Sequence, residues 1–105
     1  MVDKRNSWRY YRTMIKSFSC PDTASFFAGK RIRRFVAFEA TAMRKLQQVH
    51  AAPNLEFLRV PPGNRLEALS GDRQRQYSIR INRKWRICFV WDGQDAWQVE
   101  IVDYH

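Results

Sequence analysis

Residues 77–91 read YSIRINRKWRICFVW, and they carry the clearest strand pattern in the chain. Apolar side chains occupy alternate positions in 77–81 and again in 85–91, and the positions between them include Arg80 and Arg86. A period of two is typical of strands with one face in a core, and the short connection at 82–84 predicts a hairpin. Arg80 and Arg86 are therefore expected on the sheet face that points away from the core.

The sequence on either side extends this hairpin into a sheet. A turn at 92–95 leads into a third strand whose apolar positions are Trp97, Val99 and Ile101. Residues 65–70 are a fourth candidate strand, and 14–19 a short first one.

Two helices are predicted ahead of the sheet. Asp22 or Thr23 can cap a short helix that runs towards Gly29. Apolar and small residues then recur at helical spacing over 33–50, with Arg44 and Lys45 on the polar face. The order predicts an α+β fold, with two N-terminal helices packed on one face of a small antiparallel sheet and the other face open.

The chain of 105 residues has the size of one domain. We interpret 1–13 as a mobile N-terminal arm or extension and 14–105 as the folded domain. The chain contains no apolar run long enough for a membrane span, and 1–13 lacks the apolar segment of a signal peptide. Its two cysteines have no metal-like spacing, and a secreted chain of this size that is stapled by disulfides would usually carry four or more. We therefore expect a cytoplasmic protein without membrane contact.

Charge is the strongest feature of the composition. The net charge is +9, and 59–86 holds eight cations against two acidic residues. Most of the cations are arginine, whose planar guanidinium suits phosphate. A nucleic acid or an acidic protein is therefore the expected partner, whereas the segment lacks the amphipathic helix of a membrane binder.

The last three residues suggest chemistry. Asp103, Tyr104 and His105 follow a predicted strand and could reach one pocket. RNA can be cut without metal if the 2′-hydroxyl loses a proton, the phosphorane charge is stabilised and the leaving oxygen is protonated. Arg86 could hold the scissile phosphate. The alternatives are a polar tail and a cross-strand pair of Arg86 with Glu100.

Other chemistries lack a motif. The segment 62–73 has no Gly-Lys-Ser/Thr ending of a nucleotide-binding loop. His50 and His105 are far apart in sequence, so neither a metal nor another cofactor is expected.

Four blocks in order carry a family resemblance: PPGNRLEALSG at 61–71, YSIRIN at 77–82, WRICF at 85–89 and VEIVDYH at 99–105. Together they resemble the HigB-type toxins of the RelE/ParE superfamily, closest to the GraT-like subgroup. The likeness covers about residues 14–105.

The resemblance implies a microbial-RNase-like RelE fold and the toxin of a type II toxin–antitoxin system that regulates growth. It implies a ribosome-dependent endoribonuclease, or mRNA interferase, with the ribosome and mRNA as partners. A HigA-like helix-turn-helix antitoxin would neutralise it, and operator DNA would be reached only through that antitoxin.

The resemblance also assigns residues. Glu67 stands where the best-known HigB pattern has a histidine, and a glutamate can also act as a base. The implied catalytic residues are Asp103, Tyr104, His105, Arg86 and Glu67. The expected RNA-binding residues are Arg73, Arg65, Arg80, Lys84 and Arg83.

Two other functions remain open. A non-catalytic toxin could bind a ribosome-assembly factor, gyrase or RNA through the same basic sheet face. A DNA-binding module is disfavoured because no recognition-helix pattern is visible.

Overall fold

The sheet has four strands in the order β1-β2-β3-β4, and every neighbouring pair is antiparallel. In the computed structural model, which describes residues 14–103, the strands are β1 (Glu67–Ala68), β2 (Gln76–Arg80), β3 (Trp85–Asp92) and β4 (Asp95–Asp103). The predicted arm at 1–13 and the pair Tyr104 and His105 lie outside the described residues. The predicted hairpin is confirmed, because Arg80 pairs with Arg86 in the β2–β3 register.

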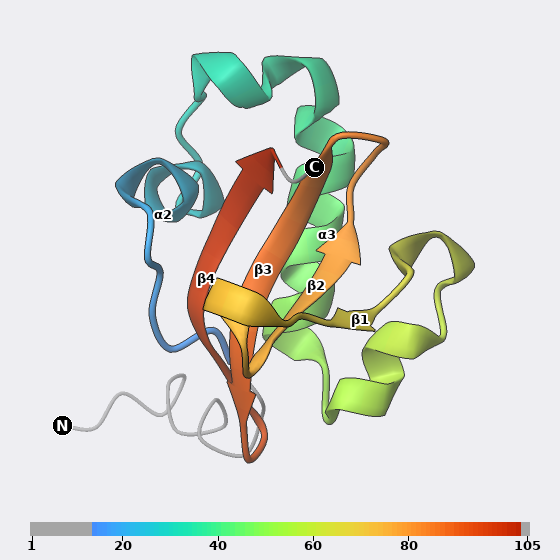
Figure 1. Cartoon of the computed structure of the whole chain (residues 1–105). Helices are drawn as coiled ribbons and strands as arrows, with labels where there is room; N and C mark the ends of the chain where they lie inside the picture. The colour runs from blue at the N-terminus through green and yellow to red at the C-terminus, as the bar shows by residue number, and fades with distance from the viewer. Residues whose placement is uncertain (1–13, 104–105) are drawn as a thin grey trace, which may run out of the picture.

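One long helix covers the core face of this sheet (Figure 1). The helix α3 (Glu39–Ala51) buries Ala42, Leu46 and Val49 completely, and their spacing places them on one stripe. They share a single core with apolar residues of β2, β3 and β4. With the short helix α2 (Pro21–Phe27), the predicted α+β fold is confirmed.

The predicted long helix begins six residues late. Residues Arg33–Phe38 form a 3₁₀ helix, η2, and the α-helix starts only at Glu39. A 3₁₀ turn places residues i and i+3 on one side. Phe35 and Phe38 therefore both contact Trp85, with ring centroids 6.0 Å and 5.0 Å from the indole.

The predicted cap of α2 is wrong. The N-cap is Cys20, and it makes no side-chain cap hydrogen bond. Asp22 instead accepts a hydrogen bond from Arg34 Nε at 3.1 Å. The Thr23 hydroxyl accepts one from the backbone N–H of Ile101 in β4 at 3.0 Å, so it ties α2 to the edge of the sheet.

The predicted first strand at 14–19 is reduced to two isolated bridges. Ile15 pairs with Ala96 and Phe18 with Val99, both parallel to β4. Together with α2, this segment covers the outer edge of β4, which would otherwise leave backbone groups unpaired.

A bulge changes the phase of β4. Pairing shifts between Cys88 and Val90, and Gln98 adopts a left-handed φ of 54°. Trp97 is consequently 38% exposed, while Val99 is fully buried, so the apolar positions named for this strand do not all lie in the core.

The predicted fourth strand at 65–70 shrinks to the two residues of β1. Arg65 has a left-handed φ of 47° and follows the 3₁₀ turn η4 (Pro62–Asn64), which leaves little extended backbone. Another 3₁₀ segment, η3, spans Leu55–Arg59.

The sheet face opposite α3 is only partly open. After β1 the chain crosses this face through the 3₁₀ turn η5 (Gly71–Arg73), seen in front of the sheet in Figure 1. Arg73 thereby reaches Glu100 on the far strand β4. None of the described helices is both long and apolar enough to cross a membrane.

Candidate active site

Arg86 is the best-held cation on the face opposite α3. Its side chain is 11% exposed, and Nε donates a 2.7 Å hydrogen bond to Ser78 Oγ. Nη2 donates to the Arg65 carbonyl at 2.9 Å and lies 3.6 Å from Glu67 Oε1. Within residues 14–103, the hydrogen bonds of this guanidinium run through Nε and Nη2, so its orientation is set by the protein before any ligand binds.

The local sequence explains this arrangement. Strand alternation places Ser78 and Arg86 on the same face, and β1 pairs Glu67 directly with Ser78. Ser78 is fully buried and small, so the guanidinium can lie over it. The alternation predicted the side on which Arg86 lies, but it gave no reason to single out Ser78.

A second ion pair lies on the same face. Arg73 Nη1 donates to Glu100 Oε2 at 2.8 Å and to Gln76 Oε1 at 3.0 Å. Glu100, named above as a partner for Arg86, is therefore paired with Arg73, and Arg86 with Glu67.

Cys88 marks the centre of this face. Burial raises the pKa of its thiol to about 11, while the Arg73 and Arg86 charges lower it and the Glu100 charge raises it. Cys88 pairs with Ser78 in β2 and with Glu100 in β4, so it lies between the Arg86–Ser78 and Arg73–Glu100 contacts.

Asp103 lies elsewhere. It pairs with Trp85 at the end of β4, and its Oδ2 is 4.0 Å from Lys84 Nζ. Alternation from the buried Ile101 places Asp103 on the α3 side of the sheet, opposite to Arg86. The structure thus does not bring Asp103 onto the face of Arg86, and the predicted catalytic residues Tyr104 and His105 lie outside the described residues.

The expected RNA-binding residues divide into groups. Arg73 is engaged by Glu100, and Lys84 lies near Asp103. The other three, Arg65, Arg80 and Arg83, line one pocket together with Arg44 and Lys45 of α3. The sequence pattern missed Lys45, which was expected on the polar face of the helix but is only 7% exposed.

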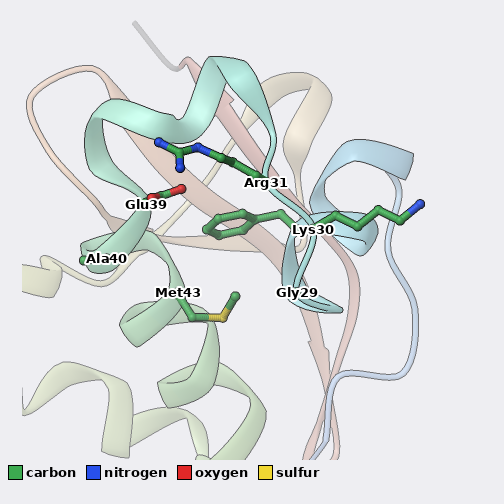
Figure 2. A pocket seen from close by; sticks show the side chains of 7 residues that line it. Gly29, Lys30, Arg31, Glu39, Ala40 and Met43 are labelled. Atoms are coloured by element: carbon green, nitrogen blue, oxygen red, sulfur yellow. The ribbon is translucent and has the colours of Figure 1, made fainter.

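A different pocket lies between α2 and α3. It has a volume of about 440 Å³ and is lined by Phe26, Gly29, Lys30, Arg31, Glu39, Ala40 and Met43. Figure 2 shows that the Lys30 side chain extends away from the other lining side chains, so this hollow is less basic than its sequence suggests. Within the described part of the chain, no cluster of three or more His, Cys, Asp or Glu residues could hold a metal ion.

Two curated proteins match about half of this chain. The chain is 43% identical over 58 residues to the toxin HigB-1 of Vibrio cholerae, a match that covers 54% of this chain and 61% of the relative. It is 36% identical over 53 residues to an uncharacterised protein of Haemophilus influenzae, covering 50% of this chain and 52% of the relative. The matches thus span little more than half the length of these curated relatives.

Solved structures share the fold at low identity. The YoeB–YefM complex from Staphylococcus aureus matches with a TM-score of 0.52 at 15% identity, covering 89% of this chain and 99% of that chain. A heterotetrameric YoeB–YefM toxin–antitoxin complex from the same species gives 0.51 at 15% identity and the same coverage. The family model for the RelE-like toxin HigB of type II toxin–antitoxin systems matches residues 22–105. The chain therefore belongs to the HigB-like family of RelE-like toxins.

Proposed function

We propose that this toxin is a ribosome-dependent endoribonuclease that cuts mRNA by attack of the ribose 2′-hydroxyl on the adjacent phosphate, without a metal ion. The observation that carries the proposal is the pre-oriented guanidinium of Arg86, with the carboxylate of Glu67 3.6 Å from its Nη2. A cation held in place before the reaction stabilises the charge that develops on a phosphorane.

Each step has a candidate group. Glu67, whose side chain is 55% exposed, accepts the proton of the 2′-hydroxyl. The 2′-oxygen forms a bond to phosphorus, and Arg86 binds the non-bridging oxygens as negative charge accumulates. The bond to the 5′-oxygen then breaks, and His105 protonates that leaving oxygen. The products are a 2′,3′-cyclic phosphate and a 5′-hydroxyl.

The remaining site residues position the RNA or orient the catalytic side chains. Tyr104 positions the RNA. Asp103 lies beside Lys84 at the end of β4 and orients the two residues that follow it, Tyr104 and His105. Arg73, held by Glu100, contributes a second cation on the same face. We assign this activity to a toxin domain at 14–105 with an arm at 1–13.

Membership of the family supports a proposal for the biological setting. We propose a GraT-like member of the family that acts in the cytoplasm on ribosome-bound mRNA. A HigA-like helix-turn-helix antitoxin neutralises it and links it to operator DNA.

The test is a cleavage assay on ribosomes programmed with a defined mRNA. Arg86→Ala should slow cleavage by about 10²–10³-fold, the usual effect of removing one group that stabilises transition-state charge. His105→Ala should slow it by about 10²–10⁴-fold, the usual contribution of a general acid. Arg59→Ala removes an exposed arginine paired with Glu56 and should leave the rate unchanged. Intact mRNA with the wild-type protein would refute the enzymatic function, and growth arrest without cleavage would favour a non-catalytic toxin.

A further inference from the structure

A strongly basic pocket lies where α3 meets the β2–β3 turn. It is open and measures about 610 Å³. Among residues 14–103, its wall includes five cations and no carboxylate. The lining residues come from α3 (Thr41, Arg44, Lys45), from the loop before β1 (Pro62, Gly63, Arg65), and from β2 and its turn (Arg80, Ile81, Asn82, Arg83).

Lys45 is the unusual member of this wall. Its Nζ donates a 2.8 Å hydrogen bond to Asn64 Oδ1, and a Cβ built on Gly63 would lie 3.7 Å from it. Asn64 is itself anchored by hydrogen bonds to Gln48 Oε1 at 3.0 Å and to the Leu58 carbonyl at 3.1 Å. No carboxylate within 14–103 forms an ion pair with this ammonium.

A buried ammonium with a neutral partner is costly. Burial, followed by the charges of Arg44, Arg80 and Arg86, lowers the pKa of Lys45 below its ordinary value of 10.5. An anion in the pocket would offset this cost and the repulsion among the cations.

The pocket is continuous with the candidate active site. Arg80 lies directly opposite Arg86 in the β2–β3 register. The Arg86 guanidinium also donates to the carbonyl of Arg65, a residue of the pocket wall. A strand of RNA whose scissile phosphate lies at Arg86 would therefore carry a neighbouring phosphate towards the pocket.

We propose that this pocket binds a backbone phosphate of the RNA strand that the active site cuts. The inference rests on the proposed function and adds a second phosphate site, formed by Arg44, Lys45 and Arg83 with Arg65 and Arg80. Arginine favours this occupant because its planar donors match phosphate oxygens. The pocket adjoins Arg86, and an RNA strand cut at Arg86 extends beyond it to a neighbouring phosphate. An acidic peptide would not be bound at Arg86, so this arrangement favours RNA as the occupant.

The test uses the full chain and a short single-stranded RNA with 2′-O-methyl riboses, which can bind but cannot be cut. Binding is followed by fluorescence anisotropy over a range of salt concentrations. The double variant Arg44→Gln/Arg83→Gln changes two exposed residues and should keep the fold. The matched control Arg33→Gln/Arg59→Gln removes the same charge from exposed positions outside the pocket.

The pocket variant should bind the RNA about tenfold more weakly at moderate salt. The slope of log K against log salt concentration should become shallower by about 0.7, because the pocket holds one phosphate and each phosphate contact contributes roughly 0.7 for a single strand. The control should stay within about threefold of wild type. Lys45→Met should also weaken RNA binding. If this variant does not fold, the result of Arg44→Gln/Arg83→Gln tests the proposal.

Equal RNA binding by the pocket and control variants would overturn the proposal. A variant that loses affinity for a deca-glutamate peptide but keeps its affinity for RNA would also overturn it and identify a protein-docking site. Because this RNA cannot be cleaved, the result is independent of catalysis. Wild-type chain that binds through the pocket but leaves ribosomal mRNA intact would refute the proposed function alone.

Discussion

Of the three groups that hold the Arg86 guanidinium, the small side chain of Ser78 is the closest. Ser78 Oγ accepts the 2.7 Å hydrogen bond from Arg86 Nε, and the serine is fully buried beneath the guanidinium. Strand alternation predicted the face on which Arg86 lies, because period two depends only on residue order. It could not predict the partner, since side-chain contacts depend on the pairing register and on the loop that carries Arg65.

Ser78→Ala should therefore weaken the site while preserving the fold. Loss of the acceptor leaves a largely buried charged donor less well paired, which should lower the free energy of unfolding by about 1–3 kcal/mol. Cleavage should also slow, because the guanidinium is held less firmly. Urea unfolding and the ribosome assay measure the two effects, and unchanged values in both would show that Ser78 does not position Arg86.

The two cysteines should differ sharply in reactivity. Cys20 is partly exposed; burial raises the pKa of its thiol, but the nearby polar groups of Thr23 and Asp22 and the Arg34 charge outweigh this and lower it below 9.0. Cys88 is fully buried, and its pKa is raised to about 11. At pH 8 only about one Cys88 in a thousand would be a thiolate.

Mass spectrometry after iodoacetamide treatment at pH 8 should find Cys20 alkylated long before Cys88 in the folded protein. In denaturant the two should react at similar rates. Preferential alkylation of Cys88 under native conditions would contradict the position of β3 in the core.

Among the helices and strands, local sequence pattern predicts some features, whereas others depend on tertiary contacts, including those at the β4 edge of the sheet. The hairpin at 77–91 and the helical stripe of α3 follow from local periodicity. The 3₁₀ start at 33–38, the uncapped α2 and the bulge at Gln98 follow from contacts between distant segments. Thr23 was a predicted cap residue, yet its hydroxyl serves β4 because the backbone N–H of Ile101 needs an acceptor at that edge.

Thr23→Val should show how much the hydrogen bond between α2 and β4 contributes to stability. Valine keeps the shape but leaves the buried Ile101 N–H unsatisfied, so the free energy of unfolding should fall by about 1–3 kcal/mol. Hydrogen exchange at the Ile101 amide should accelerate. Thr41→Val, on the rim of the basic pocket, is the matched control and should change neither quantity. Unchanged exchange at Ile101 would contradict the contact.

At the scale of the whole molecule, charge and topology act together. The sequence predicted a polyanionic partner from a net charge of +9, but it did not show which cations share a site. The crossing of η5 brings Arg73 to β4. The loop before β1 carries Arg65, and it packs beside Arg44 and Lys45 of α3. Composition predicts attraction to RNA, whereas the long-range connections determine where the strand would lie.

The most direct measurement is the chemical identity of the new RNA ends made on programmed ribosomes, read by mass spectrometry. Attack by the 2′-hydroxyl should leave a 2′,3′-cyclic phosphate upstream and a 5′-hydroxyl downstream, and the formation of both ends should depend on Arg86. A 3′-hydroxyl paired with a 5′-phosphate, or the same ends at the same rate from Arg86→Ala, would contradict it.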